Sequence, residues 1–308
     1  MAEKAAVLVG INHYAGYIRH MGRVVPLRRH KLYGCVNDVN SIFDLLIQKF
    51  GFVADNIQEL TDERAIQSAI LDALIDMVDS AAPGDHLLFY FSGHGSLYRR
   101  KPPGDDPKAE EPVFEILCPY DMDWDQEIFI SKENLKDIVN RLPDGTAIEI
   151  VLDACCAGGM RDVGRQFPAL MRMPLLGGYM DSSLSGRSRF LVPPADVASR
   201  IVSARGDTAI PRIMSTLGSD GPKRCIIWAS SNEHELSEEF IPRHGREHGA
   251  FTYFLSAALE AMPTAQRATV LESVRESLKK ERFRQIPGLF PQRPLITDNC
   301  FLKPGEFA

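Results

Sequence analysis

The sequence of 308 residues lacks any apolar run that approaches the ~18–20 residues of a membrane-spanning helix. It also lacks a basic cluster: the net charge is −6, and Arg28-Arg29 and Arg99-Arg100-Lys101 are isolated short runs. Proteins that bind nucleic acids usually carry a basic patch, so we expect neither a nucleic-acid nor a membrane partner. The apolar stretch from Ala5 to Ile11 has no small-residue cleavage site like that of a signal peptide, and we expect a cytoplasmic protein.

Cysteine is scarce, with six residues in the chain and no Cys-x-x-Cys pair. This excludes a disulfide-rich scaffold and the common structural zinc sites. His244 and His248 have a zinc-like spacing, but no cysteine pair lies near them, so no zinc site is expected. A redox or metal protein that uses Cys155 and Cys156 remains an alternative, although adjacent cysteines form only a strained bridge.

Strand-like and helix-like segments alternate along most of the chain. Continuous apolar runs are typical of parallel strands that are covered on both faces, and apolar residues three and four apart are typical of helices. The pattern predicts an α/β fold with a mostly parallel central sheet flanked by helices on both faces. The expected strands are Ala5–Ile11, Asn56–Leu60, His86–Phe91, Phe114–Cys118 (a third core strand), Ala147–Asp153 and Cys225–Ala229. The expected helices are Val36–Phe50, a helix capped by Thr61 that runs to Val78, Ser131–Leu142, Gly249–Ala261 and Thr269–Lys280.

The chain divides into three parts that we interpret as one domain. Residues 1–160 hold most of the alternating pattern, and residues 225–308 hold a strand followed by two helices. Residues 161–224 are rich in Gly, Pro, Ser and Arg, with short helices expected at Ala195–Ser203 and Arg212–Leu217. A long irregular segment inside a compact domain is usually functional or disordered.

His94 and Cys155 each follow a predicted strand and are each close to glycine. Functional sites in open parallel sheets gather at the carboxyl ends of strands, so both side chains are expected at one crevice. A thiol becomes a nucleophile near neutral pH when a base lies within hydrogen-bond reach. Taken singly, a buried cysteine is more often a small hydrophobic residue and a histidine between glycines is often a turn residue. The two together favour cysteine–histidine catalysis.

The residues around both positions resemble the metacaspases, members of the caspase family of cysteine peptidases. Tyr90-Phe91-Ser92-Gly93-His94-Gly95 resembles their histidine motif, and Asp153-Ala154-Cys155-Cys156-Ala157-Gly158-Gly159 resembles their cysteine motif. Gly34-Cys35-Val36-Asn37-Asp38-Val39 and Gly249-Ala250-Phe251-Thr252 match two further signatures. The family usually has His and Ser where this chain has Cys156 and Ala157.

The resemblance implies a caspase-like fold and an endopeptidase that cuts peptides and proteins after Arg or Lys. A cysteine–histidine mechanism itself requires no metal or organic cofactor. Cys155 would be the nucleophile and His94 its acid/base partner, with the amides of Gly95 and Cys155 as oxyanion donors. An acidic pocket would bind the basic side chain of the substrate. Its expected residues are Asp38, Asp153, Cys35 and Ser92, and Asp162 matches a further acidic position of the family.

Two more expectations concern regulation. An Arg-specific enzyme would cut itself within the irregular segment, which holds Arg165, Arg172, Arg187, Arg189 and Arg205. Many metacaspases need calcium, but Ser131 and Lys132 stand where two of the expected carboxylates belong. We therefore expect activity without calcium. A replacement site would use Asp121, Asp123 and Asp125.

Two alternatives share the fold. The changed residues after Cys155 are compatible with a catalytically impaired scaffold or switch protein. A legumain-like or gingipain-like peptidase would share the His-Gly and Cys arrangement, but those proteins usually carry secretory signals.

Overall fold

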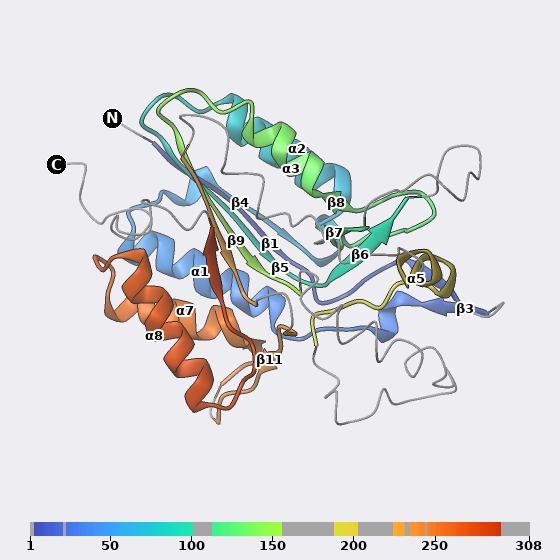
Figure 1. Cartoon of the computed structure of the whole chain (residues 1–308). Helices are drawn as coiled ribbons and strands as arrows, with labels where there is room; N and C mark the ends of the chain where they lie inside the picture. The colour runs from blue at the N-terminus through green and yellow to red at the C-terminus, as the bar shows by residue number, and fades with distance from the viewer. Residues whose placement is uncertain are drawn as a thin grey trace.

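The computed structural model describes residues 3–20, 23–100, 113–155, 188–202, 224–231, 235–243 and 245–290. Its centre is a six-stranded sheet in the order β13-β10-β9-β5-β1-β4, seen nearly edge-on in Figure 1. Only β13 runs antiparallel to its neighbour. The α/β fold with a mostly parallel sheet is therefore confirmed. The strands are β1 (Lys4–Gly10), β4 (Ile57–Thr61), β5 (His86–Ser92), β9 (Ala147–Asp153), β10 (Arg224–Ala229) and β13 (Gly288–Phe290).

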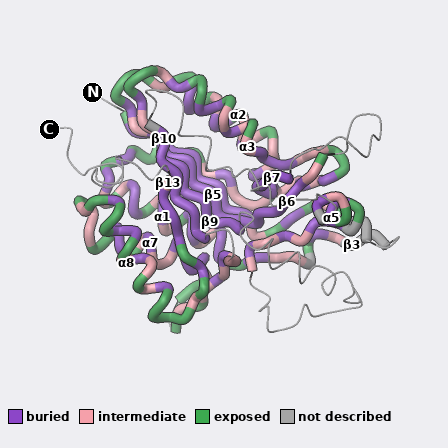
Figure 2. Tube along the Cα trace, viewed as in Figure 1, coloured by how far each residue is buried: buried purple, intermediate pink, exposed green. Residues whose placement is uncertain are grey.

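Helices cover both faces of this sheet, which explains the continuous apolar runs of its central strands. Val7, Phe89 and Ile150 point to one face, where α2 (Gln67–Asp79) and α3 (Lys132–Val139) pack. Leu8 and Tyr90 point to the other face, toward α1 (Cys35–Lys49), α7 (Ala250–Ala261) and α8 (Arg267–Lys280). Figure 2 shows the central strands as the most deeply buried part of the molecule. Alternate side chains thus enter two hydrophobic cores.

A smaller sheet lies beside the carboxyl end of the central one and corrects one sequence prediction. It comprises β6 (Gly95–Arg99), β7 (Val113–Leu117) and β8 (Ile130–Ser131). The segment Phe114–Cys118 was expected in the central sheet, but β7 pairs antiparallel with β6 and β8 instead. All five residues of β7 are buried. Burial on both faces made its apolar run indistinguishable from that of a core strand.

The remaining strands form two hairpin-like pairs. They are β2 (Tyr17–His20) with β3 (Arg23–Pro26), and β11 (Glu239–Phe240) with β12 (His248–Gly249). Helix α5 (Ala195–Val202) contacts β6 and confirms the short helix expected there, whereas the helix expected at Arg212–Leu217 lies outside the described residues.

The start of α2 also differs from the sequence prediction. Thr61 was expected to cap this helix, but it ends β4, and the short 3-10 helix η3 (Asp62–Arg64) intervenes. The first amide of α2, that of Gln67, donates instead to the Asp121 carboxylate at 2.8 Å. A cap supplied from 54 positions away in the chain has no local sequence signal. Helix α3, by contrast, begins as expected after Ser131, whose hydroxyl accepts from the amide of Asn134.

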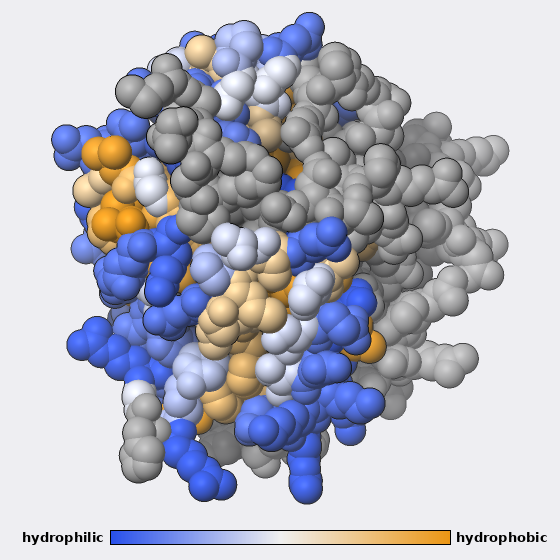
Figure 3. Space-filling model, turned by 90° about the vertical axis from the view of Figure 1, so that its left-hand side faces the viewer, coloured by the Kyte–Doolittle hydropathy of each residue, from blue (hydrophilic) through white to orange (hydrophobic). Residues whose placement is uncertain are grey.

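Among the described residues on the face drawn in Figure 3, a strip of hydrophobic side chains runs between hydrophilic ones, and a second hydrophobic group lies near the left edge. None of the helices in the described parts of the chain has the length and apolar character needed to cross a membrane. The large hydrophobic side chains that are most exposed are Tyr17, Tyr33, Val53, Ile241 and Ile286.

Candidate active site

The candidate catalytic residues lie just beyond the carboxyl ends of two adjacent strands. Strands β5 and β9 are parallel neighbours, and their last residues, Ser92 and Asp153, pair across the sheet. His94 and Cys155 each follow two residues later, so the fold brings them to one edge. Between them the backbones approach closely, since a Cβ at Gly95 would collide with the Cys155 carbonyl. Glycine is therefore required where β6 begins.

His94 is almost fully buried, and one of its two ring nitrogens has a partner. Nε2 lies 2.8 Å from the carbonyl oxygen of His30, and the ring packs against Tyr14 with centroids 5.1 Å apart. Nδ1 has no hydrogen-bond partner among the described residues. Burial is the main reason that the pKa of His94 falls to about 4, so the ring is neutral at physiological pH.

The thiol of Cys155 faces the backbone of Ser237. Its Sγ lies 2.9 Å from the Ser237 amide nitrogen and 3.3 Å from the Ser237 carbonyl oxygen, with the Ser188 hydroxyl 3.9 Å away. Burial raises the pKa of this thiol to about 12. With a neutral imidazole and a protonated thiol, the pair in this conformation is not the thiolate–imidazolium form that attacks a carbonyl.

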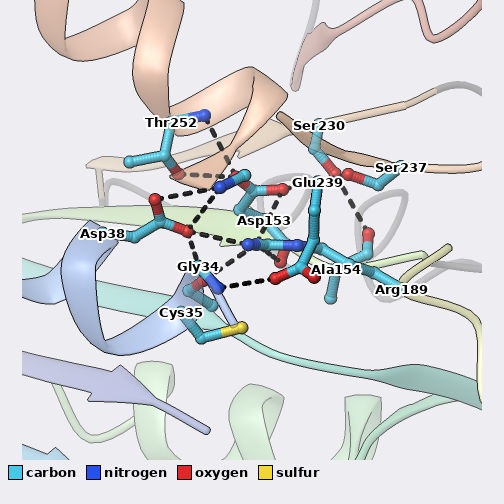
Figure 4. Close-up of polar contacts among 12 residues, drawn as sticks. Gly34, Cys35, Asp38, Asp153, Ala154, Arg189, Ser230, Ser237, Glu239 and Thr252 are labelled. Carbon is cyan, nitrogen blue, oxygen red and sulfur yellow. Dashed lines mark hydrogen bonds and ion pairs between the residues drawn. The ribbon is translucent and has the colours of Figure 1, made fainter. Parts of the chain in front are cut away.

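Beside this pair lies an acidic pocket that is filled by an arginine of the same chain (Figure 4). The two terminal nitrogens of Arg189 reach different carboxylates. Nη2 donates to Asp38 Oδ2 at 2.8 Å, and Nη1 lies 3.1 Å from Asp153 Oδ1. Nη1 also donates at 2.8 Å to the Ser92 hydroxyl and at 2.8 Å to the Asp153 carbonyl oxygen. The side chains of Arg189, Asp38 and Asp153 are all 0% exposed.

Groups from the carboxy-terminal part of the chain hold the two carboxylates in place. Asp38 accepts from the Gly249 amide at 3.0 Å, and Nδ1 of His248 lies 3.0 Å from it. Asp153 accepts from the amide and the hydroxyl of Thr252, at 3.0 and 2.6 Å. The Thr252 amide belongs to the first turn of α7, where the helix dipole favours a negative charge. The pocket wall is thus built from both halves of the domain.

The charges in the pocket compensate for the cost of burying them. Burial alone would lower the pKa of Arg189, but neighbouring negative charges, that of Asp153 foremost, keep it well above its usual value. Burial, and next to it the charge of Asp38, raises the pKa of Asp153, while Arg189 and Thr252 act in the opposite direction. A guanidinium ion is therefore the natural occupant of this pocket, since removing it would leave two buried carboxylates facing each other.

Glu239 is a third carboxylate near the guanidinium and was missed by sequence reasoning. Its Oε1 accepts from the amides of Tyr33 and Gly34, at 2.8 and 2.6 Å, next to the start of α1. Its charge also supports that of Arg189. A single glutamate in a short strand far from both motifs carries no sequence signal of this role.

Three further predicted site residues, Ser92, Cys35 and Gly95, contact Arg189 or lie near it. Ser92 donates from its hydroxyl to Asp38 at 2.8 Å, and Cys35 is a buried thiol whose pKa is raised by burial and lowered by nearby Arg189. The amide of Gly95, a predicted oxyanion donor, donates at 2.9 Å to the carbonyl oxygen of Arg189. Cys156, Asp162, Arg165, Arg172, Arg187, Arg205 and His244 lie outside the described residues.

Two of the acids proposed as replacement calcium ligands accept hydrogen bonds from backbone amides. Asp121 accepts from Gln67 as described above, and Asp123 Oδ1 accepts from the amides of Asp125 and Gln126. Within the described ranges, no three His, Cys, Asp or Glu side chains gather in a way that suits a metal ion.

Comparison with known proteins agrees with this arrangement. The family model described as "Metacaspase, peptidase C14 domain" matches residues 4–164, which is over half of the chain. The chain belongs to the metacaspase family. Metacaspase-1A of Aspergillus terreus is 26% identical over 309 residues, covering 95% of this chain and 71% of that protein. Metacaspase-4 of Arabidopsis thaliana is 33% identical over 168 residues, covering 53% of this chain and 35% of that protein.

A crystal structure with a similar fold is also known. The crystal structure of protein GSU0716 from Geobacter sulfurreducens has a TM-score of 0.65 and 17% identity, and covers 98% of this chain and 99% of that one. At this identity the likeness concerns the fold alone. The family assignment makes this metacaspase a cysteine-type endopeptidase that acts on peptide or protein substrates.

Proposed function

We propose that this metacaspase cleaves peptide bonds after arginine, with Cys155 as nucleophile and His94 as acid/base partner. The observation that carries the proposal is the side chain of Arg189 in the acidic pocket. It supports arginine as the residue before the cut, because the pocket pairs a guanidinium with two carboxylates and leaves it no exposed surface.

The geometry favours arginine over lysine, which refines the sequence prediction of either residue. Asp38 and Asp153 are contacted by different terminal nitrogens of the guanidinium. The single ammonium of lysine is a point charge and cannot reproduce this forked pattern. Loss of one charged contact at a buried site should lower kcat/KM by at least about tenfold, since charged hydrogen bonds contribute about 1.5–3 kcal/mol.

Catalysis by this pair would require a change of thiol orientation. Sγ of Cys155 would turn away from Ser237 toward the substrate carbonyl. Nδ1 of His94, which has no partner among the described residues, would accept its proton. The thiolate would attack the carbonyl carbon while the Gly95 amide stabilises the developing oxyanion. His94 would then give the proton to the leaving amine, and water would release the acyl group.

The test uses an Arg189→Ala variant, because the native side chain blocks the pocket. This variant should turn over fluorogenic peptides ending in Arg faster than those ending in Lys, and should refuse Asp. The matched control is the same variant with Cys155→Ala, which should be inactive. Equal cleavage after Arg and Asp would contradict the acidic-pocket proposal.

A catalytically impaired switch protein is the second candidate. The contacts of the Cys155 thiol with Ser237 and the raised thiol pKa favour it. An arginyl chloromethylketone separates the two candidates, since it alkylates only a reactive cysteine beside a pocket that accepts arginine. Labelling of Arg189→Ala that disappears on adding Cys155→Ala supports the peptidase, and absence of labelling supports the switch protein.

A further inference from the structure

The chain from Ser188 to Leu191 crosses the active site with a bend at Arg189 and has backbone partners on both sides. On one side, Ser188 forms an antiparallel bridge with Glu238, and the Arg189 amide donates to the Ser237 carbonyl at 2.9 Å. On the other side, the Leu191 amide donates to the Gly95 carbonyl at 2.9 Å. Main-chain pairing of this kind is how sheet edges bind extended peptides.

Side chain and backbone together place one particular peptide bond at the reactive centre. The Arg189 side chain fills the pocket, while its carbonyl oxygen accepts from the Gly95 amide. The thiol of Cys155 lies 3.9 Å from the hydroxyl of Ser188, the residue before Arg189. The bond that follows this carbonyl is Arg189–Phe190. Several arginines of residues 161–224 are candidate cleavage sites by sequence, and the contacts single out this one.

We propose that Cys155 cuts the Arg189–Phe190 bond of its own chain, and that the new carboxy-terminal Arg189 then remains in the pocket as a tethered product inhibitor. The inference rests on the proposed function, because it uses the same nucleophile and the same pocket. It adds a regulatory property: cleavage and full activity become two separate events.

The cleavage step balances with groups that are present. Cys155 Sγ bonds to the Arg189 carbonyl carbon as the bond to the Phe190 nitrogen breaks, and His94 transfers the thiol proton to that nitrogen. Water then hydrolyses the thioester, which returns the proton to the thiol and leaves a carboxylate on Arg189. No oxidant, metal or second substrate is needed.

The contacts that hold Arg189 survive this reaction. The pairing with Asp38 and Asp153, the bond to Ser237 and the bridge at Ser188 all lie before the cut. The Gly95 amide can donate to the new carboxylate as it does to the carbonyl. Only the contacts of the far side, such as the Leu191 amide with Gly95, pass to the other fragment.

The covalent connection makes this inhibitor hard to displace. Arg189 stays linked to Cys155 through residues 156–188, because the cut falls after it. A linker of this length gives the arginine an effective concentration on the order of millimolar. A peptide substrate at micromolar concentration would then compete poorly, so cut protein should show a raised KM with a nearly unchanged kcat.

The experiment begins with incubation of purified wild-type protein until mass spectrometry finds termini at Arg189 and Phe190. The rate of this cut should not depend on protein concentration, and Cys155→Ala should stay whole. Arg187→Ala, a matched loss of an arginine two positions away, should be cut at the same bond. For an Arg peptide, KM of the cut wild type should exceed that of Arg189→Ala by at least about tenfold.

Carboxypeptidase B, which removes a terminal arginine, supplies an independent measurement. Trimming Arg189 from the cut wild type should lower its KM to that of Arg189→Ala, which itself should not respond. Equal KM values for cut wild type and Arg189→Ala would overturn the tethered inhibitor. An active Arg189→Ala together with a wild type that is never cut at this bond would overturn the cleavage site. Failure of Arg189→Ala to cleave or to be labelled would instead refute the proposed function.

Discussion

The acidic pocket and the catalytic pair follow the same two strands but differ in how complete they are. In the pocket, Asp38 and Asp153 have partners for both carboxylate oxygens, and these come from distant parts of the chain. In the pair, Nδ1 of His94 has no partner among the described residues, and the Cys155 thiol contacts Ser237. The pocket that holds the Arg189 guanidinium is therefore complete in this structure, whereas the reactive geometry of the pair is not.

The difference indicates which part of the site limits activity. A pocket that is already formed loses little entropy when arginine binds, whereas the thiol must reorient and lose its proton before it can react. Substitutions in the two regions should therefore fail in different ways. The predictions below use the Arg189→Ala background, so that an external substrate can enter the pocket.

The largest effect is expected in the catalytic pair. Cys155→Ala should abolish turnover of an Arg peptide, and His94→Ala should lower kcat by about 10⁴-fold or more, because a thiol without its base is a poor nucleophile. Cys156→Ala should retain most of the activity. Steady-state kinetics of the three variants checks this, and a dead Cys156→Ala beside an active Cys155→Ala would move the nucleophile by one position.

The next largest effect is expected from substitutions in the acidic pocket. Asp153→Asn and Asp38→Asn should each lower kcat/KM for an Arg peptide at least ~30-fold, because loss of a buried charge partner costs on the order of 2–5 kcal/mol. The matched control is Asp55→Asn, which changes an exposed acid of η2 (Ala54–Asn56). Unlike Cys155→Ala, both pocket variants should still react at Cys155 with a thiol reagent that lacks arginine.

A smaller effect is expected on the pH dependence of ligand binding. It follows from the pKa of Asp153, which burial and the neighbouring Asp38 raise. Without Arg189 the opposing influence is lost, so protonation should begin above the usual Asp pKa of about 3.9. Agmatine should bind the ionised pocket, and its affinity should fall as pH falls, by at most about tenfold per pH unit for one proton. Isothermal titration on the Arg189→Ala, Cys155→Ala double variant measures this without interference from catalysis. An affinity that stays constant from pH 7 to about pH 4 would contradict the expected protonation.

The smallest change is expected from calcium. Asp121 and Asp123 already accept backbone hydrogen bonds, and Ser131 caps α3 where a carboxylate was expected by family resemblance. Turnover of an Arg peptide in excess chelator should therefore stay close to that in millimolar calcium. A rise of about tenfold or more on adding calcium would show that Asp121, Asp123 and Asp125 rearrange into a ligand set, since calcium needs 6–8 oxygens.

Much of the fold was predictable because its signals are local. The continuous apolar runs of β1, β5, β9 and β10 arise from burial on both faces of a parallel sheet. The same property misassigned β7, since a strand of a small buried sheet has the same composition. The prediction of the α2 cap was wrong for a different reason, because the Asp121 carboxylate that caps this helix comes from a distant loop.

The site residues also divide into those that have a local sequence signal and those that have none. His94, Cys155, Asp38 and Asp153 stand in short motifs, and the structure brings them to one edge of the sheet. The role of Glu239 was not predictable, because its position depends on how β11 meets the start of α1. Arg189 was one of several arginines of residues 161–224 with equal standing in the sequence. The roles of Glu239 and Arg189 thus follow from contacts between distant segments and not from sequence motifs.

The backbone at Gly249 has a consequence for engineering. This glycine lies over the pocket, and a Cβ there would collide with the Asp153 carboxylate and press on the guanidinium of Arg189. Under the proposed function, a side chain at position 249 would therefore restrict the residue that precedes the cut. Gly249→Ala would force the Asp153 carboxylate and the site of the guanidinium to shift, so this variant should reject arginine and accept a shorter cationic side chain such as ornithine.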